Sequence, residues 1–371
     1  MQIADISALY TLVLWATFSA GLLFGAIAQC THFCTMGAVA DIVNIGDWSR
    51  MRMWALAIGV AMLGFNTMVY LGWVEAGKSI YASSRLIWLS NLLGGALFGV
   101  GMVLASGCGS KTLVRIGGGS LKALVVFAVL AIAAYATMRG IVGVARVATV
   151  DTVALTLPTG QDLPSLLAGA LGADKKVLAL VLGLLLGGGL VAWALSSPQG
   201  RSADVLVAGF GIGLVVVAVW WVSGRLGHLP EHPQTLEEAF LATNSQRMES
   251  LTFVAPIAYT VDWLILFSDK SKVLTIAVVS TVGVIVGALL SALATRSFRW
   301  EGFAGTQDTA HHLVGAVLMG VGGVTAMGCT VGQGLSGVST LALGSFLAFA
   351  GIVAGAMVGL KYQVWQLERS L

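Results

Sequence analysis

The sequence predicts an all-α integral membrane protein, a polytopic helical bundle of about nine or ten spans, and three observations support this fold class. Hydrophobic residues make up 57% of the 371 residues, and charged residues make up only 10%. The mean hydropathy is +0.90, far above that of soluble domains. The apolar runs have the length of a helix that crosses the hydrocarbon core, and they do not alternate like the strands of a barrel.

The candidate spans follow one another along the chain. The first apolar run follows Asp5 rather than a basic segment, so we expect a retained helix and no signal peptide. A weaker segment, 251–268, contains Pro256 and Asp262, which predicts a half-helix or a re-entrant piece. The hydrophilic stretches 139–176 and 225–250 are expected to be extramembrane loops. The apolar runs are 8–29, 53–74, 86–107, 120–138, 177–196, 203–223, 273–295, 311–328 and 338–360.

Lys and Arg residues in the short loops bear on orientation. If the N-terminus lies outside the cytoplasm, most of them fall on the cytoplasmic side, while Arg296 and Arg299 fall on the other. We therefore expect a protein of the cytoplasmic (inner) membrane, embedded in lipid, with its N-terminus outside. The net charge of +3 is small and scattered, which predicts no nucleic-acid partner. The residues counted on the cytoplasmic side are Arg50, Arg52, Lys111, Arg115, Lys122, Arg201, Lys270 and Lys272.

An internal repeat divides the chain. "LLGGALFGVGMVLASGCG" (92–109) aligns with "HLVGAVLMGVGGVTAMGCT" (312–330) without a gap, since Cys108 and Cys329 differ by 329 − 108 = 221 positions. We interpret this as a duplication inside one transmembrane domain, 1–371, with the first copy in about 1–196 and the second in about 197–371. We expect inverted copies, although the number of spans between them leaves a parallel arrangement open. The faint likeness of 21–29 to 283–292 suggests that the latter begins the core of the second copy.

The glycines of the repeat predict close helix packing, but the residues around each cysteine predict something more. "ASGCGSKTLVRIGGG" (105–119) and "MGCTVGQGLSG" (327–337) are rich enough in Gly, Ser, Thr and Gln to break a helix at membrane depth. Such irregular backbone is tolerated only where it is buried in protein or lines a cavity. The half-helix that follows a break presents free N–H groups and a positive dipole end, which predicts an anion site. Its candidate residues are Gly107, Gly109, Ser110, Lys111 and Arg115 in the first copy, and Gly328, Thr330 and Gln333 in the second.

The four cysteines are too dispersed for a disulfide framework, and they form no CxxC pair. Cys108 and Cys329 lie at the two breaks, and Cys34 lies at a third, "QCTHFCTMGAVAD". This recurrence favours functional thiols over small buried hydrophobes. A thiol is a weak donor that suits a polarizable sulfur atom better than a hard oxyanion, although Cys30, Cys34 and His32 could instead bind a soft metal such as Cu(I). Membrane anchoring by Lys111 and Arg115, and an interfacial role for His32, also remain open.

Enzyme signatures are absent. The sequence contains no HExxH, P-loop or nucleophile elbow, and no candidate span carries a pair of acidic residues suited to a proton or cation relay. We therefore expect a thiol-lined path for an anion rather than an enzyme, with no cofactor and no metal centre.

At these residues the sequence resembles the YeeE/YedE family of sulfur-transport membrane proteins. The matching stretches begin "FCTMGAVADIVNIGDW" (33–48), "LASGCGSKTLVRIGGG" (104–119) and "AMGCTVGQGLSGVS" (326–339). The resemblance implies thiosulfate uptake, an hourglass-shaped bundle with broken helices, functional thiols at Cys34, Cys108 and Cys329, and a separate cytoplasmic sulfurtransferase of the TusA type as partner. Transport of selenium compounds, and a membrane sulfurtransferase that forms a cysteine persulfide, remain alternatives.

Overall fold

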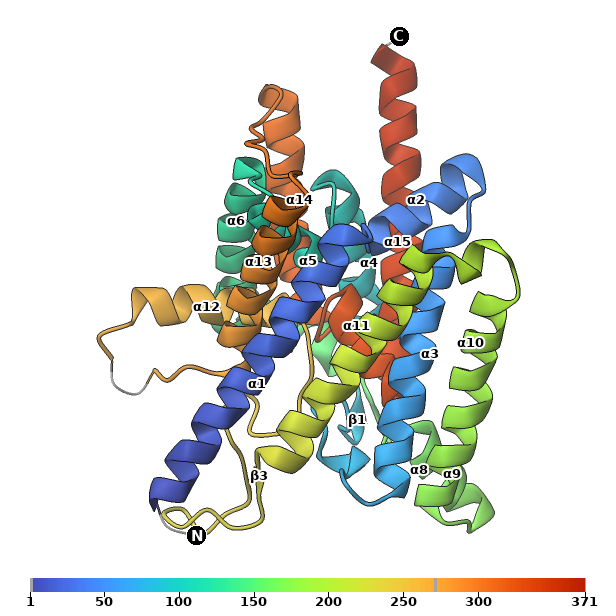
Figure 1. Cartoon of the computed structure of the whole chain (residues 1–371), viewed down its shortest axis with the longest axis vertical. Helices are drawn as coiled ribbons and strands as arrows, with labels where there is room; N and C mark the ends of the chain where they lie inside the picture. Colours follow the sequence, from blue (N-terminus) through green and yellow to red (C-terminus); the bar gives the residue numbers. More distant parts are fainter. Residues whose placement is uncertain (1–2, 270–271, 371) are drawn as a thin grey trace.

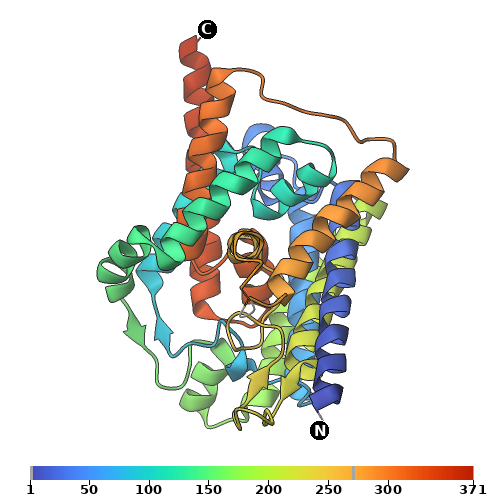
Figure 2. The ribbon, with the colours of Figure 1, turned by 90° about the vertical axis from the view of Figure 1, so that its left-hand side faces the viewer.

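The computed structural model describes residues 3–269 and 272–370 as a bundle of long helices with the two termini at opposite ends (Figures 1 and 2). The nine predicted apolar runs all coincide with helices. Lys175–Leu182 (α9) continues through a π-helical turn, Gly183–Gly187, into Gly188–Leu195 (α10). The other long helices are α1 Ile3–Cys30, α3 Ser49–Tyr70, α4 Trp88–Leu104, α6 Leu121–Arg139, α11 Ala203–Trp221, α13 Ile276–Ala294, α14 Thr306–Thr325 and α15 Leu343–Ser370.

The all-α polytopic fold class is confirmed. Within the described ranges, eight helical stretches are long and apolar enough to cross a membrane, fewer than the nine or ten spans expected. The difference lies at α14, which has 20 residues but begins with polar side chains, among them Asp308, His311 and His312. The apolar part of α14 is too short for the helix to count as a membrane span by composition, although α14 packs along α4 and α6.

Short elements fill the connections. Ala255–Ile265 (α12) has 11 residues, too few to span a membrane, which agrees with the predicted half-helix. Figure 2 looks along α12, which lies across the direction of the long helices. The two predicted loops contain short structure of their own. The elements are α2 Thr35–Ile45, α5 Gly109–Gly117, α7 Ile141–Ala148, α8 Leu163–Leu171, and the antiparallel pairs β1 Arg85–Leu86 with β2 Leu155–Thr156 and β3 His228–Leu229 with β4 Ala239–Phe240.

The repeated helices α4 and α14 pack antiparallel, backbone against backbone. A Cβ added to Gly94 would lie 2.8 Å from the carbonyl oxygen of Gly322, and one added to Gly101 would lie 2.7 Å from that of Gly315. The repeat maps Gly94 onto Gly315 and Gly101 onto Gly322, so a two-fold rotation converts one of these contacts into the other. This geometry is that of an inverted repeat.

The pair α1 and α13 does not follow this relation. The Tyr10 hydroxyl donates to the Leu274 carbonyl near one end, and Cys30 Sγ lies 3.0 Å from Ser291 Oγ near the other. The two helices therefore run parallel, whereas inverted copies would run antiparallel. The expectation that 283–292 repeats 21–29 at the start of the second copy is wrong, because this likeness comes from glycines that pack α1 directly on α13.

The predicted sides of two loops are also corrected. The backbone N–H of Arg299 donates to the Gly118 carbonyl, so the Arg296–Arg299 segment lies with Arg115 rather than opposite it. Lys272 pairs instead with Asp262 on α12, at the start of α13 and away from that end. The physical reason is that α12 does not cross the bundle, which shifts every later helix by one crossing. Lys270 lies outside the described residues.

Candidate functional site

Three turns of the same design place the three predicted thiols. In each turn a helix ends four residues before a cysteine, and a new helix starts directly after that cysteine. The residue two positions before the cysteine has a left-handed backbone conformation. The left-handed residues are His32 (φ 53°), Ser106 (φ 55°) and Met327 (φ 58°). The cysteines that follow them are Cys34 before α2, Cys108 before α5, and Cys329 before the helical segment 330–339, which contains the π-helical turn Gly332–Gly337.

Helix-end hydrogen bonds explain why the chain turns at these points. The Gly107 N–H donates to the Met102 carbonyl, and the Gly328 N–H donates to the Gly323 carbonyl, both at 2.8 Å. These are the long bonds of the Schellman motif, which satisfies carbonyls at the end of a helix. In the two repeat copies, the glycine directly before the cysteine therefore closes the first helix.

Two of the thiols, Cys34 and Cys329, cap the helices that follow them. Cys34 Sγ accepts from the Gly37 N–H and Cys329 Sγ accepts from the Gly332 N–H, both at 3.4 Å. Cys108 Sγ instead lies 3.2 Å from Ser110 Oγ. Each sulfur therefore lies at a helix N-terminus, where exposed N–H groups and the helix dipole favour negative charge.

The extended segment Leu251–Phe253, just before α12, joins two of the turns. The Phe253 N–H donates to Cys329 Sγ at 3.3 Å, and Ser336 Oγ donates to the Leu251 carbonyl at 2.7 Å. A Cβ on Gly109 would lie 2.8 Å from the Phe253 carbonyl oxygen, which explains why glycine follows Cys108. Sequence reasoning missed Phe253 and Thr252 as site residues, because no local pattern marks a contact 76 residues distant from Cys329.

The three thiols form an enclosed row. Cys34, Cys108 and Cys329 are 7%, 1% and 0% exposed. Phe253 contacts both Gly109 and Cys329, and Cys108 lies within electrostatic range of both Cys34 and Cys329, so we place Cys108 between the other two. The amino group of Lys111 lies within electrostatic range of Cys34 and Cys108, so it is the basic group beside this part of the row.

Arg115 contributes less free charge than predicted. Its guanidinium lies 3.3 Å from the carboxylate of Glu301, which also lies 2.8 Å from Lys122. Although partial burial opposes ionisation, the hydrogen bond from Lys122 and the charge of Arg115 hold the pKa of Glu301 at about 2. This carboxylate therefore stays ionised and neutralises much of the positive charge of Arg115 and Lys122.

Thr330 and Gln333 occupy the third turn in different ways. The Gln333 side-chain amide donates to the Ala326 carbonyl and so braces the turn, while a Cβ on Gly328 would lie 3.0 Å from Gln333 Cγ. The hydroxyl of Thr330 and the side-chain carbonyl of Gln333 are buried without a hydrogen-bond partner among the described residues. Thr330 thus presents an unused donor directly after Cys329.

Cys30 and His32 do not assemble into a metal site with Cys34. Cys30 faces Ser291, and within 3–269 and 272–370 no three His, Cys, Asp or Glu side chains gather as metal ligands. His32 serves the turn through its left-handed backbone.

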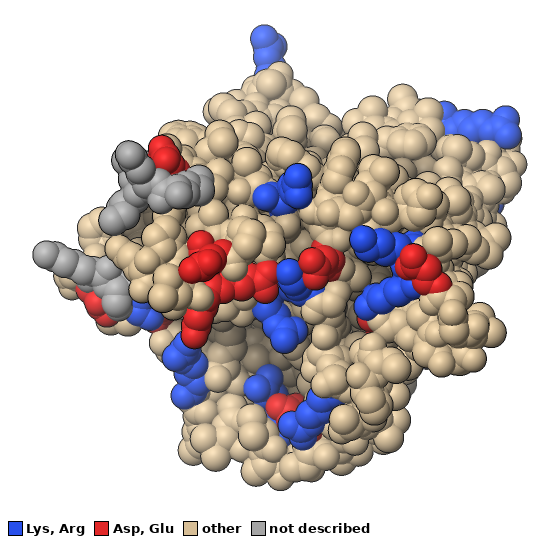
Figure 3. All heavy atoms as spheres, turned by 90° about the horizontal axis from the view of Figure 1, so that it is seen from below, with Lys and Arg blue, Asp and Glu red and all other residues tan. Residues whose placement is uncertain are grey.

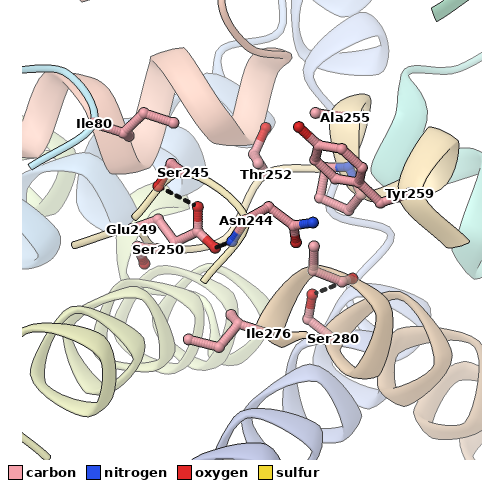
Figure 4. A pocket seen from close by; sticks show the side chains of 12 residues that line it. Ile80, Asn244, Ser245, Glu249, Ser250, Thr252, Ala255, Tyr259, Ile276 and Ser280 are labelled. Atoms are coloured by element: carbon pink, nitrogen blue, oxygen red, sulfur yellow. Dashed lines mark hydrogen bonds between the residues drawn. The ribbon is translucent and has the colours of Figure 1, made fainter. Parts of the chain in front are cut away.

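A cavity of about 70 Å³ lies beside the third turn, and Thr252 lines it (Figure 4). Thr252 Oγ1 lies 3.8 Å from Cys329 Sγ, so this cavity adjoins the row of thiols. Glu249, Ser245 and Asn244 line its other side, where the Glu249 carboxylate accepts from the Ser245 hydroxyl and the Asn244 N–H. A mostly apolar cavity that carries these polar groups on one side therefore lies beside Cys329.

A polytopic bundle with an inverted repeat and broken helices at buried polar turns defines a membrane transporter. The chain belongs to the sulphur transport family, whose model matches residues 30–358. It is 25% identical over 329 residues to the thiosulfate transporter TsuA of Escherichia coli K12, covering 85% of this chain and 84% of that protein. It is 26% identical over 353 residues to the thiosulfate transporter TsuA of Spirochaeta thermophila, covering 92% of this chain and 97% of that protein.

Proposed function

We propose that this protein takes up thiosulfate, or a closely related inorganic sulfur anion, through the row formed by Cys34, Cys108 and Cys329. The observation that carries the proposal is the enclosure of three thiols, each at the N-terminus of a helix and each within electrostatic reach of the next. The names of the two relatives, both thiosulfate transporters, support this choice of substrate.

The chemistry of the row suits a sulfur anion that must bind and leave again. Helix N-termini and the N–H groups of Phe253 and Gly332 stabilise the negative charge. The S–H groups are weak donors, and the terminal sulfur of thiosulfate is a polarizable acceptor, so each contact is favourable but easily exchanged. The amino group of Lys111 lies near Cys34 and Cys108, where it can pair with the anion.

The orientation and the partner belong to the same proposal. We place the protein in the cytoplasmic membrane with its N-terminus outside, because the start of α3, which holds Arg50, and the connection from α13 to α14, which holds Arg299, lie toward the end where the C-terminus lies (Figure 1). At the opposite end Lys and Arg are interspersed with Asp and Glu (Figure 3), as in the pair of Lys78 with Glu238. A TusA-like sulfurtransferase would then receive the sulfur at the cytoplasmic end, and a C-terminal reporter fusion tests this orientation.

Uptake of labelled thiosulfate into proteoliposomes tests the function, with selenite, sulfite and sulfate as competitors. Wild-type protein should accumulate label, and Cys108→Ala or Cys329→Ala should abolish most of it. Wild-type rates in both variants would eliminate the thiol path while leaving transport itself intact.

The second candidate function is that of a membrane sulfurtransferase, and the hydrogen bonds to the sulfur of Cys329 favour it. The N–H groups of Phe253 and Gly332 at Cys329 Sγ would stabilise a thiolate. That thiolate could attack the outer sulfur of thiosulfate, so that the S–S bond breaks, sulfite leaves with the electron pair, and a persulfide remains on Cys329. Mass spectrometry after turnover distinguishes the two: a persulfide together with released sulfite indicates the transferase, and an unmodified thiol indicates the transporter.

A further inference from the structure

A second cavity, of about 210 Å³, lies between the end of α6, the side of α12 and the start of α13. Arg139 and Lys272 line it from two different elements, and Asp262 on α12 lines it from a third. Tyr135, Tyr259 and Thr243 contribute hydroxyl groups. Its lining therefore combines two cations and neutral donors with a single carboxylate.

The charges of this cavity do not cancel. Lys272 Nζ lies 2.6 Å from Asp262 Oδ2, so these two neutralise each other. The guanidinium of Arg139, at the end of α6, forms no hydrogen bond or ion pair within 3–269 and 272–370. The guanidinium lies within electrostatic range of Asp262, Tyr259 and Tyr135 but forms an ion pair or hydrogen bond with none of them. The Arg139 guanidinium therefore gives the cavity one unpaired positive charge and five N–H donors.

This cavity adjoins the cavity beside Cys329. Asn244 and Tyr259 line both spaces, and Figure 4 shows their side chains facing the inner cavity together with Thr252. Thr252 in turn contacts Cys329, so Asn244, Tyr259 and Thr252 place polar groups at intervals between Arg139 and this thiol. No Lys or Arg lines the inner cavity among its described lining residues, whereas Glu249 does. Positive charge is therefore confined to the outer cavity.

We propose that the outer cavity is a capture site for small tetrahedral dianions, in which Arg139 binds the oxyanion before it passes Asn244 and Tyr259 toward Cys329. A guanidinium forms paired hydrogen bonds to an oxyanion, and a polar pocket of one sign raises the local concentration of its counter-ion. The inference rests on the proposed function, because it supplies the entry step of that transport path. Asp262 pairs with Lys272 and so limits the affinity of the cavity for an anion.

The test uses full-length protein in proteoliposomes, with initial uptake rates measured over a range of thiosulfate concentrations. In Arg139→Gln the KM should rise by about 5-fold at low ionic strength with little change in the maximal rate, and this rise should shrink in high salt. In Asp262→Asn, which frees Lys272, the KM should fall. Arg247→Gln is the matched control, since Arg247 is an exposed cation near Asn244 that lines neither cavity.

The outcomes separate this inference from the proposed function. Wild-type uptake with an unchanged KM in Arg139→Gln overturns the capture site and leaves transport standing. Absence of wild-type uptake overturns the transport function, and thiosulfate binding to detergent-solubilised protein, compared between wild type and Arg139→Gln, then decides the capture site alone. If Arg139→Gln fails to fold, Arg139→Lys replaces it: lysine keeps the charge but loses the paired hydrogen bonds of the guanidinium, so the KM should rise by about 2-fold. A KM for Arg139→Lys equal to that of Arg247→Gln contradicts the site.

Discussion

The backbone N–H of Phe253 donates to the sulfur of Cys329, with nitrogen and sulfur 3.3 Å apart. Phe253 belongs to a segment without regular structure, and Cys329 begins a helix in the second repeat copy. Because this contact fixes the position of a thiol from outside its own turn, the two roles of Cys329 can be separated: it caps a helix, and it presents sulfur to the path.

Cys329→Ser separates those roles. A serine hydroxyl is a good helix cap and can accept from Phe253 and Gly332, so thermal stability should stay close to wild type. Uptake should fall by about 10-fold, equivalent to about 1.4 kcal/mol or roughly one hydrogen bond, because oxygen lacks the polarizability of sulfur. Full uptake in Cys329→Ser would show that the cap alone matters.

Uptake should depend on pH through Glu249. Burial raises the pKa of this carboxyl to about 7, and hydrogen bonds from Ser245 and Asn244 only partly offset it. Below pH 7 the carboxyl is mainly neutral, and above pH 7 its charge repels an anion that approaches Thr252. Uptake should therefore decrease between pH 6 and pH 8, by about 3-fold or more at subsaturating thiosulfate.

Glu249→Gln should remove this pH dependence and keep the rate of the acidic range. Glu238→Gln is the matched control. Hydrogen bonds from Lys78 and His228 lower the pKa of Glu238, so it is ionised at both pH values and its replacement should leave the pH profile unchanged. A profile that survives in Glu249→Gln would assign the pH dependence to another group.

Gly322→Ala should destabilise the protein. The new Cβ would lie 2.5 Å from the backbone nitrogen of Phe98, which cannot move away without shifting α4. Overpacking of this kind costs about 1 to 3 kcal/mol, measurable as a lower melting temperature in detergent. Gly188→Ala in α10 is the control, because nothing lies within 4 Å of its added Cβ, and it should be neutral or stabilising. Equal melting temperatures for the two variants would contradict the close packing of α4 and α14.

The left-handed residue before Cys329 offers a further test. Met327 has φ 58° and is 42% exposed, so Met327→Gly should relieve the backbone at little cost in packing. Met327→Val should cost about 1 to 2 kcal/mol, because a β-branched residue resists this conformation. Both the uptake rate and the melting temperature of Met327→Gly should equal or exceed those of wild type, and both should be lower in Met327→Val. The reverse order would mean that the side chain of Met327, and not its backbone, matters.

The apolar runs were sufficient to predict the long helices, because about 20 consecutive apolar residues can satisfy the membrane only as a helix. The Gly-Cys pairs were sufficient to predict the turns at Cys108 and Cys329. The contact of Phe253 with Cys329 and the cavity at Arg139 could not be predicted, because they bring together residues that no local pattern connects. The sides of Arg299 and Lys272 depended on whether α12 crosses the bundle, which Pro256 and Asp262 left undecided.

The burial of the thiols bears on how well the membrane retains its proton gradient. Cys108 and Cys329 have almost no surface that water can reach, so in the described part of the chain no file of water molecules touches their side chains. Protons move along such files, and a permanent one would discharge the gradient that drives other membrane processes. Buried thiols and closely packed helices can close the passage between transport events. Single anions can then cross without an open water channel through which protons would leak.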